Sequence, residues 1–170
     1  MPLARSAVLD TSLILSLGGA SALDLLSDDP AHTWHITPIV RGEVISQPTR
    51  SQISRAILEG DLVTMELDTD SADEMKAFVE WSRSVDPGEA EAIAVGLTRS
   101  WTIGIEDRFA QRRLTSAVGP AAWVNTAGLL LAAVRSGIRS LSDADAIFTR
   151  LDCYSGYVKR GITSLSDLTG

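Results

Sequence analysis

The chain has 170 residues, of which 45% are hydrophobic and 22% charged; this composition is typical of one globular domain and excludes a disordered chain. No apolar run reaches the ~18 residues that a membrane span requires, and the formal net charge of −7 disfavours a nonspecific nucleic-acid-binding protein, which carries a basic surface. The chain enters a predicted strand without a signal-peptide core, and it has a single cysteine, Cys153, to which we assign no catalytic role. Both features lead us to expect a cytoplasmic protein. We expect one domain over residues 1–170.

The first predicted strand ends on a carboxylate. Residues 7–9 form a short apolar run that predicts a buried strand, and Asp10, Thr11 and Ser12 end it. The apolar pattern then resumes as a helix, which Thr11 or Ser12 can cap. Ligands of a parallel α/β sheet bind outside the carboxyl ends of its strands, so Asp10 is either a site residue or only a helix cap.

Strands and helices alternate along the rest of the chain. Further strands are predicted at residues 34–37, 62–67, 101–105 and 122–124. Helices are predicted at residues 21–26, 38–44, 51–59, 72–84, 86–97, 108–117, 127–134 and 142–151, with a short strand and a helical turn at 164–168 in the tail. This order predicts an α/β three-layer sandwich, in which helices cover both faces of a mainly parallel sheet of about five strands.

More carboxylates occupy positions that favour a site. Glu43 lies in an apolar stretch, at the rim of the core or in a site. Glu89 and Glu91 lie in the first turn of a helix that is apolar nearly all round, where a buried carboxylate needs a partner. Glu106 and Asp107 follow the strand at 101–105 directly. The acids that open the helix at 72–84, including Glu74, are interpreted instead as solvated capping residues.

The carboxyl ends of parallel strands share one edge of the sheet. We therefore expect Asp10 and Asp107 to meet there, with Glu43 and one glutamate of the 86–97 helix presented from helices. Such a set repels itself strongly without a cation, and oxygen ligands suit Mg²⁺ or Mn²⁺. These ions activate water and stabilise charge on a phosphodiester, which indicates metal-assisted phosphodiester hydrolysis.

The order of these segments resembles the PIN-domain ribonucleases. The matching segments are the strand followed by Asp-Thr-Ser, PIVRGEV, PGEAEAIAVGL and IGIEDRFAQRR, and AAWVNTAGLLLAAVRSGI resembles the C-terminal half of the branch that includes bacterial toxin–antitoxin toxins. The resemblance covers roughly residues 7–168. It implies a Mg²⁺- or Mn²⁺-dependent endoribonuclease acting on RNA, a homodimer and a small antitoxin partner. The implied catalytic and metal-binding residues are Asp10, Glu43, an acid of the GEAE turn and Asp107, supported by Thr11 or Ser12.

Several residues keep two interpretations. Glu89 and Glu91 lie about 200° apart around a helix at ~100° per residue, so only one is expected to face the site; we take Glu89 as catalytic and keep both as candidate metal ligands. We favour Asp107 over Glu106. Asn125 ends the strand at 122–124 and either binds metal-bound water or substrate, or caps the next helix.

Three arginines, Arg108, Arg112 and Arg113, follow the last acid and either bind RNA phosphates or form a solvated surface. The apolar helices at 22–26 and 127–134 favour self-association.

Other functions remain in competition. The acidic composition favours a catalytically weak PIN-like module that binds nucleic acid or a protein partner. An aspartyl-phosphate phosphatase is disfavoured because no second aspartate stands two residues after Asp10, and a phosphoacceptor domain because neither Lys76 nor Lys159 follows a strand.

Overall fold

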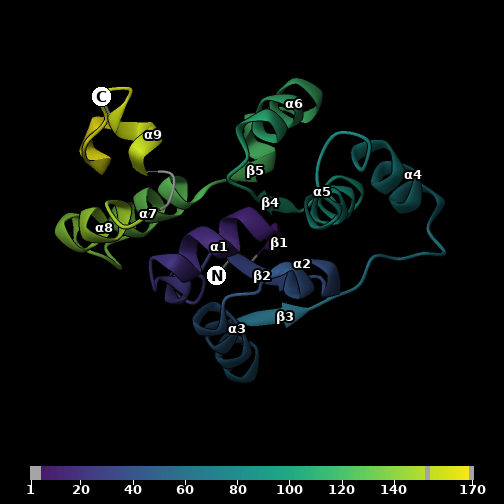
Figure 1. Cartoon of the computed structure of the whole chain (residues 1–170), viewed down its shortest axis with the longest axis horizontal. Helices are drawn as coiled ribbons and strands as arrows, with labels where there is room; N and C mark the ends of the chain where they lie inside the picture. The colour runs from purple at the N-terminus through teal and green to yellow at the C-terminus, as the bar shows by residue number, and fades with distance from the viewer. Residues whose placement is uncertain (1–4, 152–153, 169–170) are drawn as a thin grey trace.

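Five parallel strands form the central sheet of the computed structural model, which describes residues 5–151 and 154–168 (Figure 1). The sheet order is β3-β2-β1-β4-β5, and every pair of neighbours is parallel. The strands are β1 (Arg5–Leu9), β2 (His32–Ile36), β3 (Leu62–Thr64), β4 (Thr102–Gly104) and β5 (Trp123–Val124). Parallel neighbours require crossover connections, which explains why helices separate the strands along the chain.

The helices cover both faces of this sheet. They are α1 (Thr11–Gly19), α2 (Pro38–Glu43), α3 (Gln47–Glu59), α4 (Ala72–Trp81), α5 (Pro87–Arg99), α6 (Arg108–Val118), α7 (Thr126–Arg135), α8 (Leu141–Phe148) and α9 (Tyr154–Val158). Three short 3₁₀ turns are η1 (Leu23–Leu25), η2 (Pro120–Ala122) and η3 (Leu165–Leu168). No helix among residues 5–151 and 154–168 has the length and apolar character needed to cross a membrane.

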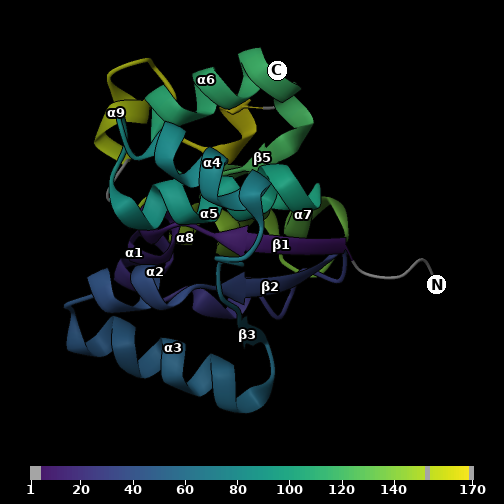
Figure 2. The ribbon, with the colours of Figure 1, turned by 90° about the vertical axis from the view of Figure 1, so that its right-hand side faces the viewer.

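Alternating side chains of the strands pack into two separate hydrophobic cores, one on each face of the sheet. Ala7 and Leu9 of β1 pack with apolar residues of α1, α3, α7 and α8, whereas Val8 packs on the other face with α5 and α6. The period of two along a strand produces this division. Figure 2 shows β1 and β2 running the same way, with α1 and α2 at their carboxyl ends. The three-layer α/β prediction is confirmed.

Several element boundaries differ from the sequence prediction. β3 ends at Thr64 because it pairs only with β2, which itself ends at Ile36. α8 begins at Leu141, after the N-cap Ser140, and not at residue 142. The described part of the tail forms α9 and η3 and holds no strand, so the strand predicted there is wrong. Cys153 lies outside the described residues.

The interpretation of Glu74 as a solvated residue is wrong, and the argument from apolar helices to self-association loses its support. Glu74 is not solvated: its side chain is buried, and Arg99 binds both carboxylate oxygens, at 2.6 and 3.0 Å. The apolar side chains of the helices at 22–26 and 127–134 pack mainly in the chain's own core. They consequently give no support for self-association.

Candidate active site at the carboxyl edge of the sheet

Asp10 stands at the centre of the edge, directly after the middle strand β1. Its backbone N–H donates to the Gly104 carbonyl at 2.9 Å, and its side chain caps α1 by accepting from the Ser12 N–H at 3.1 Å. The residue is only 1% exposed. Burial raises the pKa of the Asp10 carboxyl to about 6, against the opposing effect of the Ser12 hydrogen bonds. The helix-cap interpretation is therefore correct in geometry, but a helix cap needs no such burial.

The two residues after Asp10 bind different partners at this edge through their hydroxyl groups. The Ser12 hydroxyl donates to the Asp10 carboxylate and accepts from the Glu106 N–H at 3.0 Å, which joins the ends of β1 and β4. The Thr11 hydroxyl donates to the Glu43 carboxylate. Both residues thus have the geometry of supporting groups for the acids at this edge.

Glu43, the last residue of α2, reaches across to the start of α5. Its Oε1 accepts from the Gly88 N–H at 3.0 Å. A Cβ atom at position 88 would lie 2.2 Å from Glu43 Oε2 and 2.8 Å from Thr11 Oγ1. Only glycine at this position leaves room for the Glu43 carboxylate, so the close approach of α2 and α5 depends on Gly88.

The two glutamates of α5 face different surroundings, as their separation around the helix predicts. Glu89 is 9% exposed, and its Oε1 is buried without a hydrogen-bond partner in the described part of the chain. Burial, together with the negative charges of Asp10 and Asp107, raises the pKa of the Glu89 carboxyl to about 8. Glu89 therefore faces the other acids of the edge.

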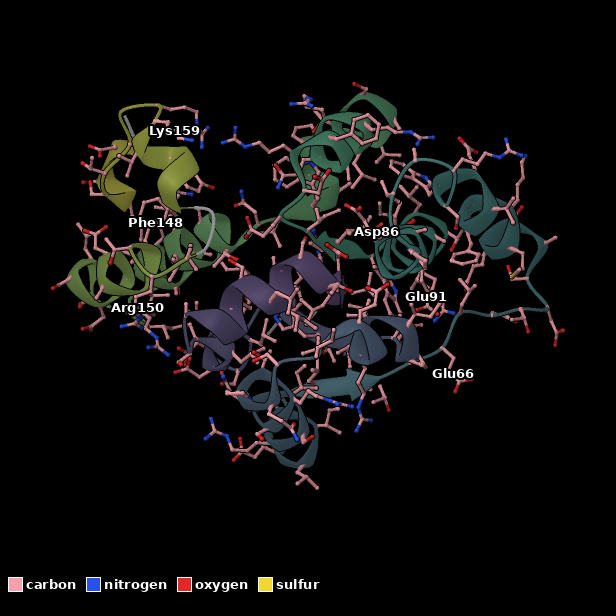
Figure 3. All side chains as sticks on the ribbon, viewed as in Figure 1. Glu66, Asp86, Glu91, Phe148, Arg150 and Lys159 are labelled. Atoms are coloured by element: carbon pink, nitrogen blue, oxygen red, sulfur yellow. The ribbon has the colours of Figure 1, made fainter. Side chains whose placement is uncertain are left out.

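Glu91 turns toward the beginning of α2 instead. Burial raises the pKa of its carboxyl, while hydrogen bonding from Thr37 and Ile39, at the start of α2, lowers it. The acidic neighbours that act on it are Glu43 and Glu66, and neither Asp10 nor Asp107 is among its main electrostatic partners. Figure 3 shows Glu91 on the α2 side of α5.

Glu106 and Asp107 divide their roles in a similar way. Glu106 Oε1 accepts from the Thr126 N–H at 2.6 Å and so holds the start of α7. Asp107 is exposed, caps α6 by accepting from the Ala110 N–H at 2.8 Å, and acts electrostatically on Glu89. Asn125 is the N-cap of α7, with its Oδ1 accepting from Gly128 at 2.9 Å, as its helix-cap interpretation predicts.

The chemistry of these acids suits a hard cation. None of Asp10, Glu43, Glu89 and Asp107 makes an ion pair with a basic side chain in the described part of the chain. All their donor atoms are oxygens, and the unpartnered Glu89 Oε1 offers a buried ligand atom. Among the described residues, however, no three acidic, histidine or cysteine side chains converge closely enough to hold an ion. Glu43 is bound instead by Thr11 and Gly88, and Asp107 by the Ala110 N–H.

The three arginines of α6 have different neighbours. Arg113 bonds to Ser84 and to Glu80 at 3.4 Å, and lies over the Trp81 ring at 4.0 Å, so α4 holds it. Arg108 and Arg112 are exposed and make no ion pair in the described part. Arg108 lines a hollow of about 490 Å³ together with Asp107 and Arg160.

Sequence reasoning missed Arg160, which comes from the tail. Its guanidinium lies 4.6 Å from the centre of the Tyr157 ring, and this contact places it opposite α6. The Lys159-Arg160 pair in a polar tail carries no signal of this placement, because only the folded chain puts Arg160 across the hollow from α6.

Comparison with known proteins gives one match. A protein-family model described as a PIN domain matches residues 6–164. No curated protein and no solved structure matches the chain significantly.

Proposed function

The chain belongs to the PIN-domain family, a family of nucleases, and on this premise we propose that it is a Mg²⁺- or Mn²⁺-dependent endoribonuclease that hydrolyses RNA phosphodiester bonds. The observation that carries the proposal is the buried Glu89 carboxyl, whose pKa is raised by burial and by Asp10 and Asp107, with no basic partner among the described residues. A buried group of this kind at the carboxyl edge of a parallel sheet is typical of a functional site.

In this proposal each acid has a role. Asp10, Glu43, Glu89 and Asp107 would hold the metal ions, which would supply an activated water and neutralise the charge that develops on the phosphodiester. Thr11 and Ser12 orient the Glu43 and Asp10 carboxylates through their hydroxyl groups. Arg108 and Arg112 bind phosphates of the RNA beside the metal ions. Glu91 fixes the start of α2, and hence Glu43, through hydrogen bonds from Thr37 and Ile39.

The direct test is cleavage of labelled RNA. We expect cleavage in Mg²⁺ or Mn²⁺, none in chelator, and none by Asp10→Asn under any of these conditions. RNA that stays intact with the wild-type protein in both metals would contradict the nuclease assignment.

A catalytically weak PIN-like module that binds nucleic acid or a protein is the second candidate. It is favoured by the lack of three converging ligand side chains among the described residues and by the sequence pI near 4.7. The two candidates differ in one observable: the module binds RNA or metal without cleaving RNA.

We also propose two protein partners, a small antitoxin and a second copy of the chain. Both rest on the resemblance to the toxin branch of the family. Growth arrest on expression of the chain, relieved by a neighbouring small gene, supports the toxin role.

Gly88→Ala is predicted to damage activity far more than stability. The added methyl group forces the flexible Glu43 carboxylate away from Thr11, so we expect cleavage to fall about a hundredfold. The free energy of unfolding should change by no more than about 1–3 kcal/mol, as at an overpacked site. Gly42→Ala on α2 is the matched control, because no atom of the described residues lies within 4 Å of its added Cβ atom. Equal cleavage rates for the two variants would contradict the role of Glu43.

Arg112→Ala is predicted to weaken RNA binding uniformly across sequences. One lost phosphate contact should lower the slope of log K against log salt by about 1. The control is Arg135→Ala, an exposed arginine in the last turn of α7, at the helix end remote from Asn125. An unchanged slope, measured by fluorescence anisotropy, would assign Arg112 to the solvated surface.

A further inference from the structure

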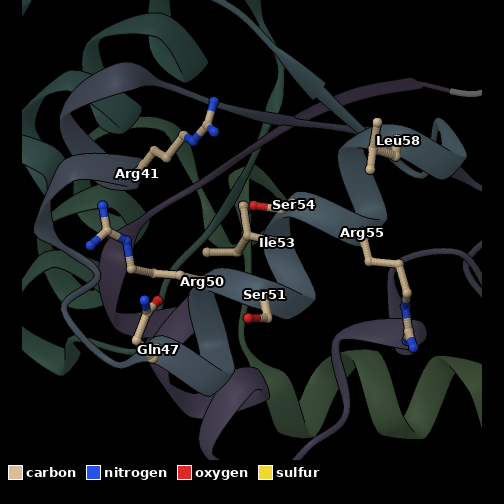
Figure 4. Close-up of a pocket in the computed structure, with 8 residues that line it drawn as sticks. All are labelled: Arg41, Gln47, Arg50, Ser51, Ile53, Ser54, Arg55 and Leu58. Atoms are coloured by element: carbon tan, nitrogen blue, oxygen red, sulfur yellow. The ribbon is translucent and has the colours of Figure 1, made fainter.

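A second group of arginines lies on the other side of the acidic edge, in a groove between α2 and α3. The groove encloses about 460 Å³ (Figure 4). Its lining residues are Arg41, Gln47, Arg50, Ser51, Ile53, Ser54, Arg55 and Leu58. Apart from the floor at Ile53 and the rim at Leu58, these side chains are polar or positively charged, and none is acidic.

Two of these arginines are left without a counter-charge. Arg41 and Arg50 are exposed, make no ion pair within residues 5–151 and 154–168, and extend over the same side of the hollow in Figure 4. Arg55 differs, because it pairs with Glu59 at 3.7 Å and extends away from the other two. Like charges that share a hollow repel each other, and an anion bound between them removes this repulsion.

The topology places this groove beside the acids but opposite the arginines of α6. α2 follows β2 and α3 leads into β3, whereas α6 follows β4, and β1 with Asp10 lies between β2 and β4. Arg41 stands two residues before Glu43 on α2. Figures 1 and 2 show α3 and α6 at opposite ends of the molecule, with α1 and α2 between them. A polyanion that crosses the acidic edge therefore meets arginines on both sides.

We propose that the groove of Arg41 and Arg50 binds the phosphodiester backbone of the RNA strand that crosses the acidic edge, so that the substrate is held on both sides of the bond to be cleaved. The proposal rests on the RNA substrate of the proposed function. Gln47, Ser51 and Ser54 add hydrogen-bond donors for phosphate oxygens, while none of the described residues that line the groove is aromatic and able to stack on a base. Binding there is accordingly independent of base sequence and needs a strand of several nucleotides.

The test compares RNA binding by Arg41→Gln/Arg50→Gln with binding by Arg55→Gln, a control from the same groove. The probe is a labelled single-stranded RNA of about a dozen nucleotides, a length within the site sizes of single-strand binding proteins. Its fluorescence anisotropy is measured over a salt series in Ca²⁺, and gels check that the RNA stays intact. The double variant should lower the salt slope by about 2, one for each lost phosphate contact, and weaken binding at low salt about tenfold or more. Arg55→Gln should match wild type. A trinucleotide, too short to reach both sides, should bind the double variant and wild type alike.

Two results would overturn the proposal for the groove. One is a wild-type protein that binds no RNA, and the other is a double variant whose affinity for the long RNA equals that of Arg55→Gln. An acidic peptide that loses affinity for the double variant while RNA does not would assign the groove to a protein partner and also overturn the proposal. Failure of the nuclease assignment looks different, since wild type would then fail to cleave although the double variant still loses RNA affinity. Unfolding curves of all three proteins confirm that the variants are folded.

Discussion

Asp10→Asn is expected to abolish RNA cleavage and to remove most of the stabilisation that Mg²⁺ or Mn²⁺ gives the wild-type protein. Asparagine caps a helix about as well as aspartate, so the start of α1 should stay intact. In chelator the variant should be more stable than wild type, because it no longer buries a carboxyl whose pKa is raised to about 6. With metal, the wild type should gain about 2.7 kcal/mol at a hundredfold excess over the dissociation constant, and the variant much less.

The measurement is a melting series of both proteins in chelator, Mg²⁺ and Mn²⁺, run beside the cleavage assay. Equal metal-induced shifts in the two proteins would reject Asp10 as a ligand. A shift confined to wild type, without cleavage, would favour the binding module over the nuclease.

The positions of Asp10 and Asp107 were predictable from the sequence because each depends on local order alone. A short apolar run, a carboxylate and a helix start recur at residues 7–17 and 101–117, and a parallel sheet necessarily brings such points to one edge. The same local logic explains why the fold class could be predicted. The tail could not, because α9 has no strong period and takes its place by packing Tyr157 against Phe148.

Choices between adjacent acids depend on neighbours that are distant in sequence. Glu89 and Glu91 share one apolar helix, and only the positions of Asp107 and Thr37 show which of them faces the edge. The sequence around Glu74 is typical of an ordinary capping acid, but Arg99, 25 residues later, binds its carboxylate. Spacing along a helix predicts that two side chains diverge, but it does not reveal what each one meets.

Glu89→Gln and Glu91→Gln are therefore expected to differ sharply, although the two substitutions are chemically identical. Glu89→Gln should lower cleavage by about two orders of magnitude or more, as expected when a metal ligand is lost. It should also remove most of the metal-induced rise in melting temperature. Glu91→Gln should keep that rise, because Glu91 lies against the start of α2, where Thr37 and Ile39 bond to it. Equal metal responses of the two variants would contradict the assignment of Glu89 as the ligand.

The pH dependence in chelator provides an independent measurement on Glu89. Its pKa is raised from 4.5 to about 8 in the folded protein, so the folded state binds this proton more tightly than the unfolded state. The stabilisation that follows is complete below pH 4.5 and is lost as the pH rises through about 8. The wild-type melting temperature should consequently fall between pH 5 and 8 in chelator, the raised pKa of Asp10 acting in the same direction. Glu89→Gln should fall less steeply over this range, and a curve parallel to wild type would show that Glu89 does not titrate there.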